Sequence, residues 1–331
     1  MEQPPKSPIT APSLEAIRET AARVAPYLLR TPTVPCYSPV VAERVGEDTD
    51  VVFKLELLQR TGSFKPRGAL NVMMHLSDEE KARGVTAFSA GNHAIATAFA
   101  AQTLGISATV AMPKTANPFR VAQCQRYGAT IKFADDIAAL IQTVEGLQRD
   151  EGRTLVHPFE GVHTSEGTAT VGLELLEDAG QLDAVIVPVG GGGLISGIAA
   201  AVKQLNPTIQ VFGVEPEGAT GMAESLKQGA PVSRVALSTI ADSLGAPLHM
   251  PYSFSLVAQY VDQMVTVSDA EMAAHMRLMF EEMKLAVEPA GAAALAALTG
   301  PLRQPLSGRR VGVVVCGSNI DVATWQRFAN G

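Results

Sequence analysis

Continuous apolar, β-prone stretches alternate with alanine-rich amphipathic stretches along most of this chain. The apolar stretches predict strands at residues 84–88, 108–112, 130–133, 184–189, 211–214 and 310–316. The amphipathic stretches between them predict helices, for example over 93–104, 119–127 and 194–205. Buried strands separated by helices are typical of parallel sheets that are covered on both faces. The sequence therefore predicts an α/β fold with mainly parallel sheets.

Several helix starts support this pattern. Ser77 and Glu80, and likewise Ser268 and Glu271, have the spacing of a capping box, and the second is expected to open a helix that runs to about Leu285. A further helix is predicted over 14–29 and a short strand over 51–57. The first dozen residues are polar and proline-rich and predict a loose arm.

The chain is long enough for one large domain or two coupled ones. It has 331 residues, of which 47% are apolar and 18% are charged, so it can bury a sizeable core. We expect a small α/β domain over 84–158, inserted in a larger domain made of 1–83 and 159–331, with the active site in the cleft between them.

Charge and cysteine content exclude several classes. The net charge is −7 and no run of Lys or Arg stands out, so no nucleic-acid partner is expected. The apolar runs are too short to span a membrane, and residues 1–12 do not resemble a signal peptide, which favours the cytoplasm. The three cysteines are far apart and support neither a disulfide framework nor a zinc site; they are Cys36, Cys124 and Cys316.

Four consecutive glycines follow the strand predicted at 184–189. Gly190 to Gly193 lead directly into a helix that begins near Leu194. Successive exposed amides at a helix N-terminus bind phosphate well, whereas the alternative is a tight flexible turn. The pattern is neither a P-loop nor GxGxxG, because no GKS or GKT follows and Ser196 stands at the last position. We therefore expect a phosphate that belongs to neither a nucleoside triphosphate nor a dinucleotide.

Three other segments could carry chemistry. Lys65 lies between an aromatic residue and a proline in Ser63-Phe-Lys-Pro-Arg-Gly-Ala69. Taken alone, it is interpreted as an ordinary surface lysine. It becomes a nucleophile only if the pKa of its amine is lowered. Ser89-Ala-Gly-Asn-His-Ala94 joins a strand to a helix, and alone it reads as a capped turn. Val311 to Asn319 is a buried strand that ends in small polar residues, where ligands often bind.

Together and in this order, these motifs resemble the serine/threonine dehydratase group of fold type II pyridoxal-phosphate enzymes. The likeness extends over about residues 14–322. It implies a tryptophan synthase β-like fold with two three-layer α/β domains, and pyridoxal 5′-phosphate as cofactor. It also implies that Lys65 carries the cofactor and takes the substrate's α proton, and that a small amino acid is the substrate.

The resemblance assigns the remaining roles position by position. Phe64 packs against the cofactor ring, Asn92 bonds its 3′ oxygen, and Cys316 faces its pyridine nitrogen as a neutral thiol. Glu288 lies near the cofactor. The phosphate loop comprises Gly190, Gly191, Gly192, Gly193 and Leu194. The loop that grips the substrate carboxylate comprises Ser89, Ala90, Gly91, Asn92 and His93.

Departures from the family pattern bear on the substrate. Serine racemases of this group have a proton-donating Ser where this chain has Ala90, so elimination is favoured over racemisation. O-acetylserine sulfhydrylases resemble Thr-Ser-Gly-Asn-Thr at this loop, which argues against β-replacement. Glu166 replaces the usual Gln of an Ala-Gly-Gln-Gly-Thr stretch.

A metal site is also implied by the resemblance. Divalent metal sites in relatives use a Glu, a backbone carbonyl and an Asp, and a divalent or monovalent cation is therefore a possible second cofactor of this chain. Glu215 and Ala219 match the first two, but Gly221 stands at the Asp position, which leaves either a weakened cation site or a strand-end Glu in solvent.

The leading hypothesis is an ammonia-lyase that dehydrates threonine or serine to a 2-oxo acid and ammonia. One alternative is a dehydratase for a larger β-hydroxy amino acid such as a hydroxyaspartate or a phenylserine, with Arg67 and His163 as contacts for an extra carboxylate. The others are an amino-acid racemase with side elimination and a non-enzymatic binding protein on the same fold. We expect a homodimer and no feedback inhibition, since the chain shows no room for a regulatory domain after Asn319.

Overall fold

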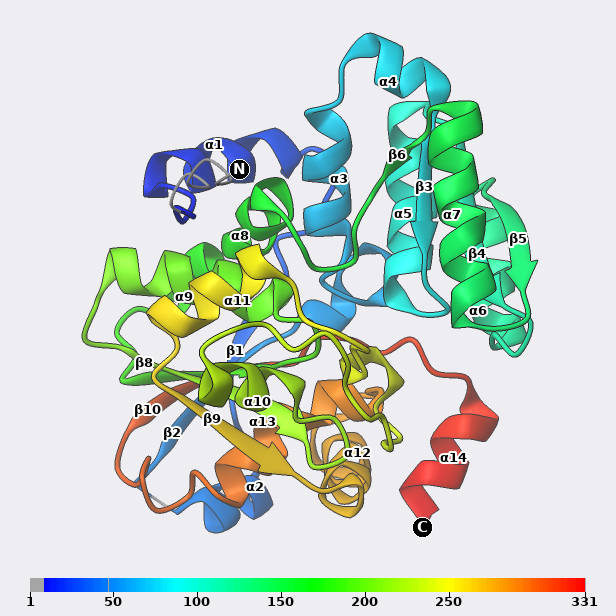
Figure 1. Cartoon of the computed structure of the whole chain (residues 1–331). Coiled ribbons are helices and arrows are strands. Elements are labelled where there is room, and N and C mark those ends of the chain that lie inside the picture. Colours follow the sequence, from blue (N-terminus) through cyan, green and yellow to red (C-terminus); the bar gives the residue numbers. More distant parts are fainter. Residues whose placement is uncertain (1–8, 47, 331) are drawn as a thin grey trace.

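The computed structural model describes residues 9–46 and 48–330. Two sheets organise the chain, a six-stranded sheet and a four-stranded sheet, and helices cover both faces of each (Figure 1). The expected α/β architecture with mainly parallel sheets is confirmed. Residues 1–8 of the predicted arm, 1–12, lie outside the described residues.

The larger sheet has the strand order β1-β2-β10-β7-β8-β9. All neighbours are parallel except β1 and β2, which pair antiparallel at the edge. Its central strands β7 and β10 are buried, except for Arg310 at the start of β10, as their apolar sequences predict. The strands are β1 (Thr33–Pro35), β2 (Asp50–Lys54), β7 (Ala184–Pro188), β8 (Gln210–Pro216), β9 (Gln263–Val267) and β10 (Arg310–Val314).

Helices pack on both faces of this sheet. One group is formed by α1 (Leu14–Val24), α3 (Pro66–Met74), α8 (Val162–Ala179), α9 (Gly193–Leu205) and α11 (Pro251–Tyr260). The other is formed by α2 (Pro39–Val45), α12 (Asp269–Met283) and α13 (Pro289–Thr299). Helix α13 is alanine-rich and buried on all sides, so it lies inside the molecule rather than at its surface.

The smaller sheet is entirely parallel, in the order β5-β4-β3-β6. Its strands fall within the segment 84–158 that the sequence singled out, and it occupies the upper right of Figure 1. The strands are β3 (Val85–Phe88), β4 (Ala108–Pro113), β5 (Thr130–Ala134) and β6 (Thr154–Leu155); the helices beside them are α5 (Asn92–Leu104), α6 (Pro118–Arg126) and α7 (Ile137–Glu151).

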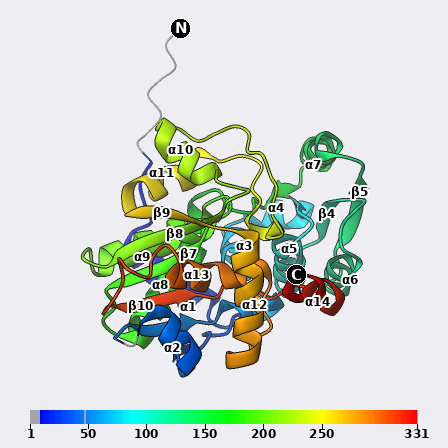
Figure 2. The same cartoon turned by 90° about the horizontal axis from the view of Figure 1, so that it is seen from below.

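Shorter elements complete the fold. They are α4 (Asp78–Arg83), α10 (Gly221–Gln228), α14 (Val322–Asn330) and the 3-10 turns η1 (Glu56–Leu58), η2 (Arg60–Gly62) and η3 (Asp242–Leu244). Figure 2 shows α14 lying between α12 and the helices of the smaller sheet. The Asn117 amide donates to Asp321 at 2.7 Å, which ties the start of α6 to the segment before α14.

Most predicted elements are present, with instructive differences at their ends. Both capping boxes form, at Ser77 and at Ser268. Helix α1 ends at Val24 rather than near residue 29, because Pro26 cannot continue the helical hydrogen bonds. The strand expected over 51–57 ends at Lys54 and gives way to η1. In the described part of the chain, no helix combines the length and the apolar character that crossing a bilayer requires.

Candidate active site

A cavity opens where β7 and β10 of the larger sheet end and α5 of the smaller sheet begins. It encloses about 430 Å³, including its mouth. Residues from seven separate segments line it: Phe64, Lys65, Asn92, Phe159, Pro188, Gly190, Gly191, Gly192, Gly193, Leu194, Ser243, Leu244, Glu288, Ala290 and Cys316. The structure thus brings together all the residues that the sequence predicted to bind the cofactor.

Lys65 directly precedes α3, and Pro66 occupies the first position of that helix. Its Nζ donates to the carbonyl of Pro158 at 2.5 Å. Part of the side chain is exposed within the cavity, but burial of the amine lowers its pKa to about 8, against smaller opposing effects of Cys316 and Glu288. A lysine with this pKa has a substantial neutral fraction near physiological pH, which a nucleophile requires.

The four glycines connect β7 to α9 in a tight loop. Within the described part of the chain, no protein acceptor takes the backbone amides of Gly190, Gly191 or Gly192. A Cβ at Gly191 would lie 2.3 Å from the ring of Phe159, and Gly192 has φ of +90°, so neither position tolerates a side chain. The loop therefore presents free amides at the N-terminus of α9, as an anion site requires.

Asn92 and Glu288 are hydrogen-bonded to one another inside the cavity. The Asn92 amide donates to Glu288 Oε1 at 2.6 Å, and Ser243 donates to the same oxygen at 3.1 Å. Asn319 donates to Asn92 Oδ1 at 2.8 Å and so fixes the orientation of the amide. Burial raises the pKa of Glu288, whose side chain is 1% exposed. Its Oε2 has no hydrogen-bond partner among the described residues.

Cys316 lies just beyond the end of β10. Its carbonyl accepts a hydrogen bond from the amide of Phe64 at 3.2 Å, which places the cysteine beside the Lys65 segment. Burial raises the pKa of the thiol well above its ordinary value, and the carboxylate of Glu288 raises it further. The thiol is therefore neutral, as the sequence analysis expected for this position.

The loop from Ser89 to His93 joins β3 to α5 next to the cavity. Ser89 Oγ accepts from the amide of Gly91 at 3.1 Å. His93 bonds the carbonyl of Val156 through Nε2 at 2.7 Å, and burial together with the charge of Lys65 lowers its pKa to about 3, so the imidazole is neutral. His93 lines a second cavity of about 230 Å³, which shares Phe64, Lys65 and Gly193 with the first.

Arg67 does not face the cavity, and the expectation that it contacts a substrate carboxylate is not supported. Its guanidinium is 1% exposed and binds Glu56 at 2.8 Å and Glu174 at 2.7 Å. Lys54 binds the same Glu174 at 2.7 Å. Four charged groups therefore neutralise one another beneath α3, and none is available to a ligand.

The other predicted contacts also lie outside the two cavities. Both carboxylate oxygens of Glu215 accept backbone amides, from Met222 at 2.7 Å and Ala223 at 2.9 Å, and burial raises the pKa of this carboxyl to about 7. Ala219 is buried nearby on the same connection. His163 and Glu166 contact each other, with a distance of 2.9 Å between Nδ1 and Oε2.

Several residues of the cavity were not predicted from the sequence. Phe159 lies on an irregular segment, and Ser243 and Leu244 belong to the short 3-10 turn η3. None of the three stands in a periodic pattern or a motif, so no local signal distinguishes them. Arg120 is likewise new: it donates to the carbonyl of Asn319 at 2.9 Å and pairs with Asp242. This contact connects α6 of the smaller sheet to the rim of the cavity.

The site fits pyridoxal phosphate. It holds an amine of lowered pKa, unpartnered amides suited to a phosphate, a buried neutral thiol and an aromatic ring, all on one cavity. An α/β fold with this constellation defines a pyridoxal-phosphate enzyme of fold type II.

Comparisons with known proteins agree. The model of the family described as pyridoxal-phosphate dependent enzyme matches residues 24–317. The chain is 50% identical to phenylserine dehydratase of Ralstonia pickettii over 96% of both chains, and 39% identical to L-threonine ammonia-lyase of Thermotoga maritima over 96% of this chain and 78% of that one. The solved structure of maize serine racemase superposes with a TM-score of 0.91 at 37% identity, covering 97% of this chain and 98% of the other.

The chain therefore belongs to the pyridoxal-phosphate-dependent enzymes, in the serine/threonine dehydratase group. The predicted fold type, the predicted cofactor and the predicted lyase class are confirmed. The general prediction of an ammonia-lyase for β-hydroxy amino acids agrees with these relatives.

Proposed function

We propose that this enzyme eliminates the β hydroxyl of a small β-hydroxy amino acid, of the threonine or serine type, as water. Hydrolysis of the enamine product takes up one water and releases ammonia and a 2-oxo acid. One observation supports it most: the amine of Lys65, with its pKa lowered to about 8, shares a cavity with the free amides of the glycine loop and the neutral thiol of Cys316. Pyridoxal phosphate, when bound, supplies an electron sink for the substrate's α carbon.

Each residue has a distinct role in this proposal. Lys65 would carry the cofactor and, once its amine is free and neutral, would take the α proton of the substrate. The amides of Gly190 to Leu194 would hold the phosphate at the start of α9, and Phe64 would pack on the ring. Asn92 would bind the ring oxygen, and the neutral thiol of Cys316 would lie near the ring nitrogen without charging it.

The substrate carboxylate binds, in our proposal, to the loop formed by Ser89, Ala90, Gly91, Asn92 and His93. This loop leads into α5, and its last two residues, Asn92 and His93, belong to the first turn of that helix, where backbone amides favour an anion. The neutral state of His93 suits a hydrogen-bonding rather than a charged role. The loop belongs to the proposed small domain, 84–158, and Lys65 to the large one, so substrate lies between them.

Three further features remain proposals. The first is a homodimer, which would have twice the mass of the chain in solution. The second is a location in the cytoplasm. A cation at Glu215 and Ala219 would have to compete with the two amides that already occupy the carboxylate. Activity that is unchanged by magnesium or by a chelator would exclude that site.

The proposal is tested by release of 2-oxo acid from a panel of β-hydroxy amino acids, with the Lys65→Ala variant as control. We expect turnover by the wild type, and loss of both turnover and the visible absorbance of the lysine-bound cofactor in the variant. Full turnover in Lys65→Ala would contradict the mechanism, and absence of the absorbance band in the wild type would favour a binding protein. L-serine converted mainly to D-serine rather than to pyruvate would instead identify a racemase.

A β-aryl substrate is the second candidate. The relative of 50% identity is a phenylserine dehydratase, and the rings of His157 and Phe159 line the cavities that contain Lys65. His157 packs edge-on against Phe159, with 4.6 Å between ring centroids, and against Phe88 at 5.8 Å. Aromatic rings arranged edge to face favour contact with a further aromatic ring, such as that of a β-aryl substrate. A kcat/KM higher for phenylserine than for threonine and serine would establish this candidate.

A further inference from the structure

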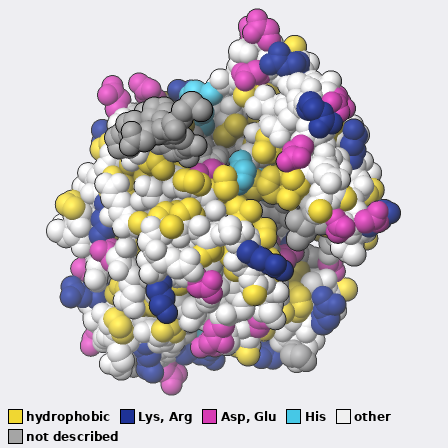
Figure 3. All heavy atoms as spheres, viewed as in Figure 1, with side chains coloured by type: hydrophobic (Ala, Val, Ile, Leu, Met, Phe, Trp, Pro, Cys, Tyr) yellow, Lys and Arg dark blue, Asp and Glu magenta, His cyan; other side chains and the backbone are white. Residues whose placement is uncertain are grey.

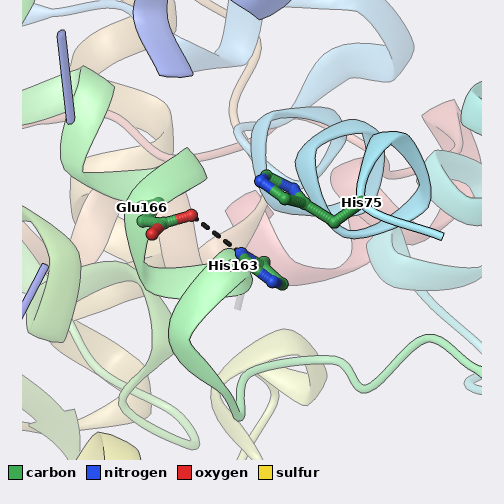
Figure 4. Close-up of side chains that lie close together, drawn as sticks. All are labelled: His75, His163 and Glu166. Atoms are coloured by element: carbon green, nitrogen blue, oxygen red, sulfur yellow. Dashed lines mark hydrogen bonds and ion pairs between the residues drawn. The ribbon is translucent and has the colours of Figure 1, made fainter. Parts of the chain in front are cut away.

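His75, His163 and Glu166 gather where the end of α3 meets the first turn of α8 (Figure 4). His75 directly follows α3, while His163 and Glu166 are one turn apart on α8. One possible ligand atom from each lies within 4.8 Å of those from the other two. His75 is exposed, His163 is half-buried and Glu166 is buried, so the group is open to solvent on one side. Histidine side chains are visible on the face shown in Figure 3.

The hydrogen bonds around His75 fix its tautomer. Arg23 approaches Nε2 at 3.1 Å, and a guanidinium can only donate, so Nε2 carries the lone pair. Nδ1 therefore carries the proton, which it donates to the carbonyl of Asn71 at 2.7 Å. Histidines that bind metals usually use the nitrogen with the lone pair while the other donates to a carbonyl or carboxylate, so His75 needs only to exchange Arg23 for the ion at Nε2.

Asn71, whose carbonyl accepts from His75, also orients Glu166. Its Oε2 accepts from the Asn71 amide at 3.0 Å and lies 2.9 Å from Nδ1 of His163. Asn71 also donates to the carbonyl of His163 at 2.8 Å and is fully buried. One buried amide thus orients two of the three groups, which is how a second layer of side chains supports metal ligands.

We propose that His75, His163 and Glu166 bind one divalent transition-metal ion, such as Zn²⁺, at a site separate from the active-site cavity. Two imidazoles and one carboxylate match the ligand preference of Zn²⁺ and similar ions, and leave room for water. The His-x-x-Glu spacing places two ligands on one helical face, as in other helix-borne metal sites. Magnesium prefers oxygen ligands and is not expected here.

Binding requires only local movement. Ligands about 2.1 Å from zinc in tetrahedral geometry lie roughly 3.4 Å apart, so His163 and Glu166 must separate slightly. The rings of His75 and His163 are stacked, with centroids 3.7 Å apart, and Arg23 must move away from Nε2 of His75, whose Nδ1 keeps its bond to Asn71. His75 is exposed and His163 is half-buried, so an ion can approach both rings from solvent.

The ion would connect two helices that carry active-site residues. Helix α3 begins immediately after Lys65, and Thr164 of α8 lines the second cavity. None of the three proposed ligands lines either cavity. Metal binding is therefore independent of the assignment of Lys65, and its test does not depend on the substrate.

The experiment is calorimetric titration of the holoenzyme with Zn²⁺, with Mg²⁺ titrated in parallel. We expect one Zn²⁺ per chain and no Mg²⁺ at this site. His163→Ala and Glu166→Gln should weaken Zn²⁺ binding at least tenfold. Glu79→Gln, which removes an exposed carboxylate of α4 outside the cluster, should bind as the wild type does.

Substitution of Arg23 should change the affinity for Zn²⁺ in the opposite direction. Arg23→Gln removes a positive charge and a strong donor that compete with the ion for His75, so it should tighten Zn²⁺ binding several-fold. Absence of saturable Zn²⁺ binding, or equal binding by His163→Ala of native circular dichroism, would overturn the proposal. If His163→Ala does not fold, Glu166→Gln and Arg23→Gln decide: unchanged affinity in both would also overturn it.

Discussion

The side-chain amide of Asn92 donates to Glu288 at 2.6 Å and thereby joins the first turn of α5 to the residue before α13. The two residues are 196 positions apart in the chain. Asn319 donates to Oδ1 of the same amide. Glu288 accepts one amide hydrogen of Asn92, and among the described residues no acceptor takes the second. The smaller sheet is thus attached to Glu288 through a residue that also lines the cavity.

The lowered pKa of Lys65 predicts the pH dependence of cofactor capture. Only the neutral amine attacks the aldehyde, and each pH unit below a pKa of about 8 reduces that fraction about tenfold. The rate at which the apoenzyme recovers its visible absorbance should rise with pH and level off above about 8. A rate that still rises steeply towards pH 10 would contradict the burial of this amine.

The same shift also predicts how the stability of the apoenzyme changes with pH. Between pH 8 and 10.5 the unfolded chain keeps the Lys65 proton and the folded chain has lost it, so the free energy of unfolding should rise with pH. Urea unfolding of the apoenzyme across this window measures the slope. Lys65→Met should lack this contribution, whereas equal slopes in the two proteins would sink the prediction.

Gly191→Ala should abolish cofactor binding. Its Cβ would lie 2.3 Å from the ring of Phe159, which also lines the cavity, so either the loop or the ring must move. We expect a loss of stability of about 1–3 kcal/mol and a loss of bound cofactor, measured by thermal unfolding and by absorbance. Gly146→Ala is the matched control: its Cβ meets only ordinary contacts within α7, so it should stabilise by about 0.5–1 kcal/mol. Full cofactor occupancy in Gly191→Ala would be inconsistent with the role of the loop.

Arg67→Met should destabilise the fold rather than alter substrate choice. Removing the guanidinium leaves the fully buried Glu56 carboxylate uncompensated, which costs about 3–5 kcal/mol. Urea unfolding measures the loss. Arg149→Met, which removes an exposed arginine paired only with its neighbour Asp150, should change stability by less than about 1 kcal/mol. Equal effects of the two substitutions, or a selective rise in KM for acidic substrates in Arg67→Met, would argue against this account.

The sequence predicted the site where its chemistry is local. Lys65, the glycine loop and the Ser89 to His93 loop each lie in a short motif at the end of a regular element, so strand and helix patterns were enough to place them. Arg67 was misread, because its partners Glu56 and Glu174 come from other elements and only the packed fold brings all three together. Phe159 was missed for a similar reason, since its contact with the glycine loop is set by tertiary packing and not by any pattern around it.

Ala90 offers a direct test of why elimination should prevail over racemisation. The resemblance to serine racemases assigns this position to the proton donor on the face of the substrate opposite Lys65, and a methyl group cannot donate a proton. Ala90→Ser supplies a hydroxyl in the same loop, between β3 and α5, without a large change in volume. We expect D-serine formed from L-serine to rise at least tenfold relative to the wild type, while pyruvate release continues. Chiral chromatography of the products measures this ratio, and Ala94→Ser, on the buried first turn of α5, is the control that should form no more D-serine than the wild type does. No D-serine from a folded, cofactor-loaded Ala90→Ser would mean that a donor at position 90 is not sufficient and that another group sets the outcome.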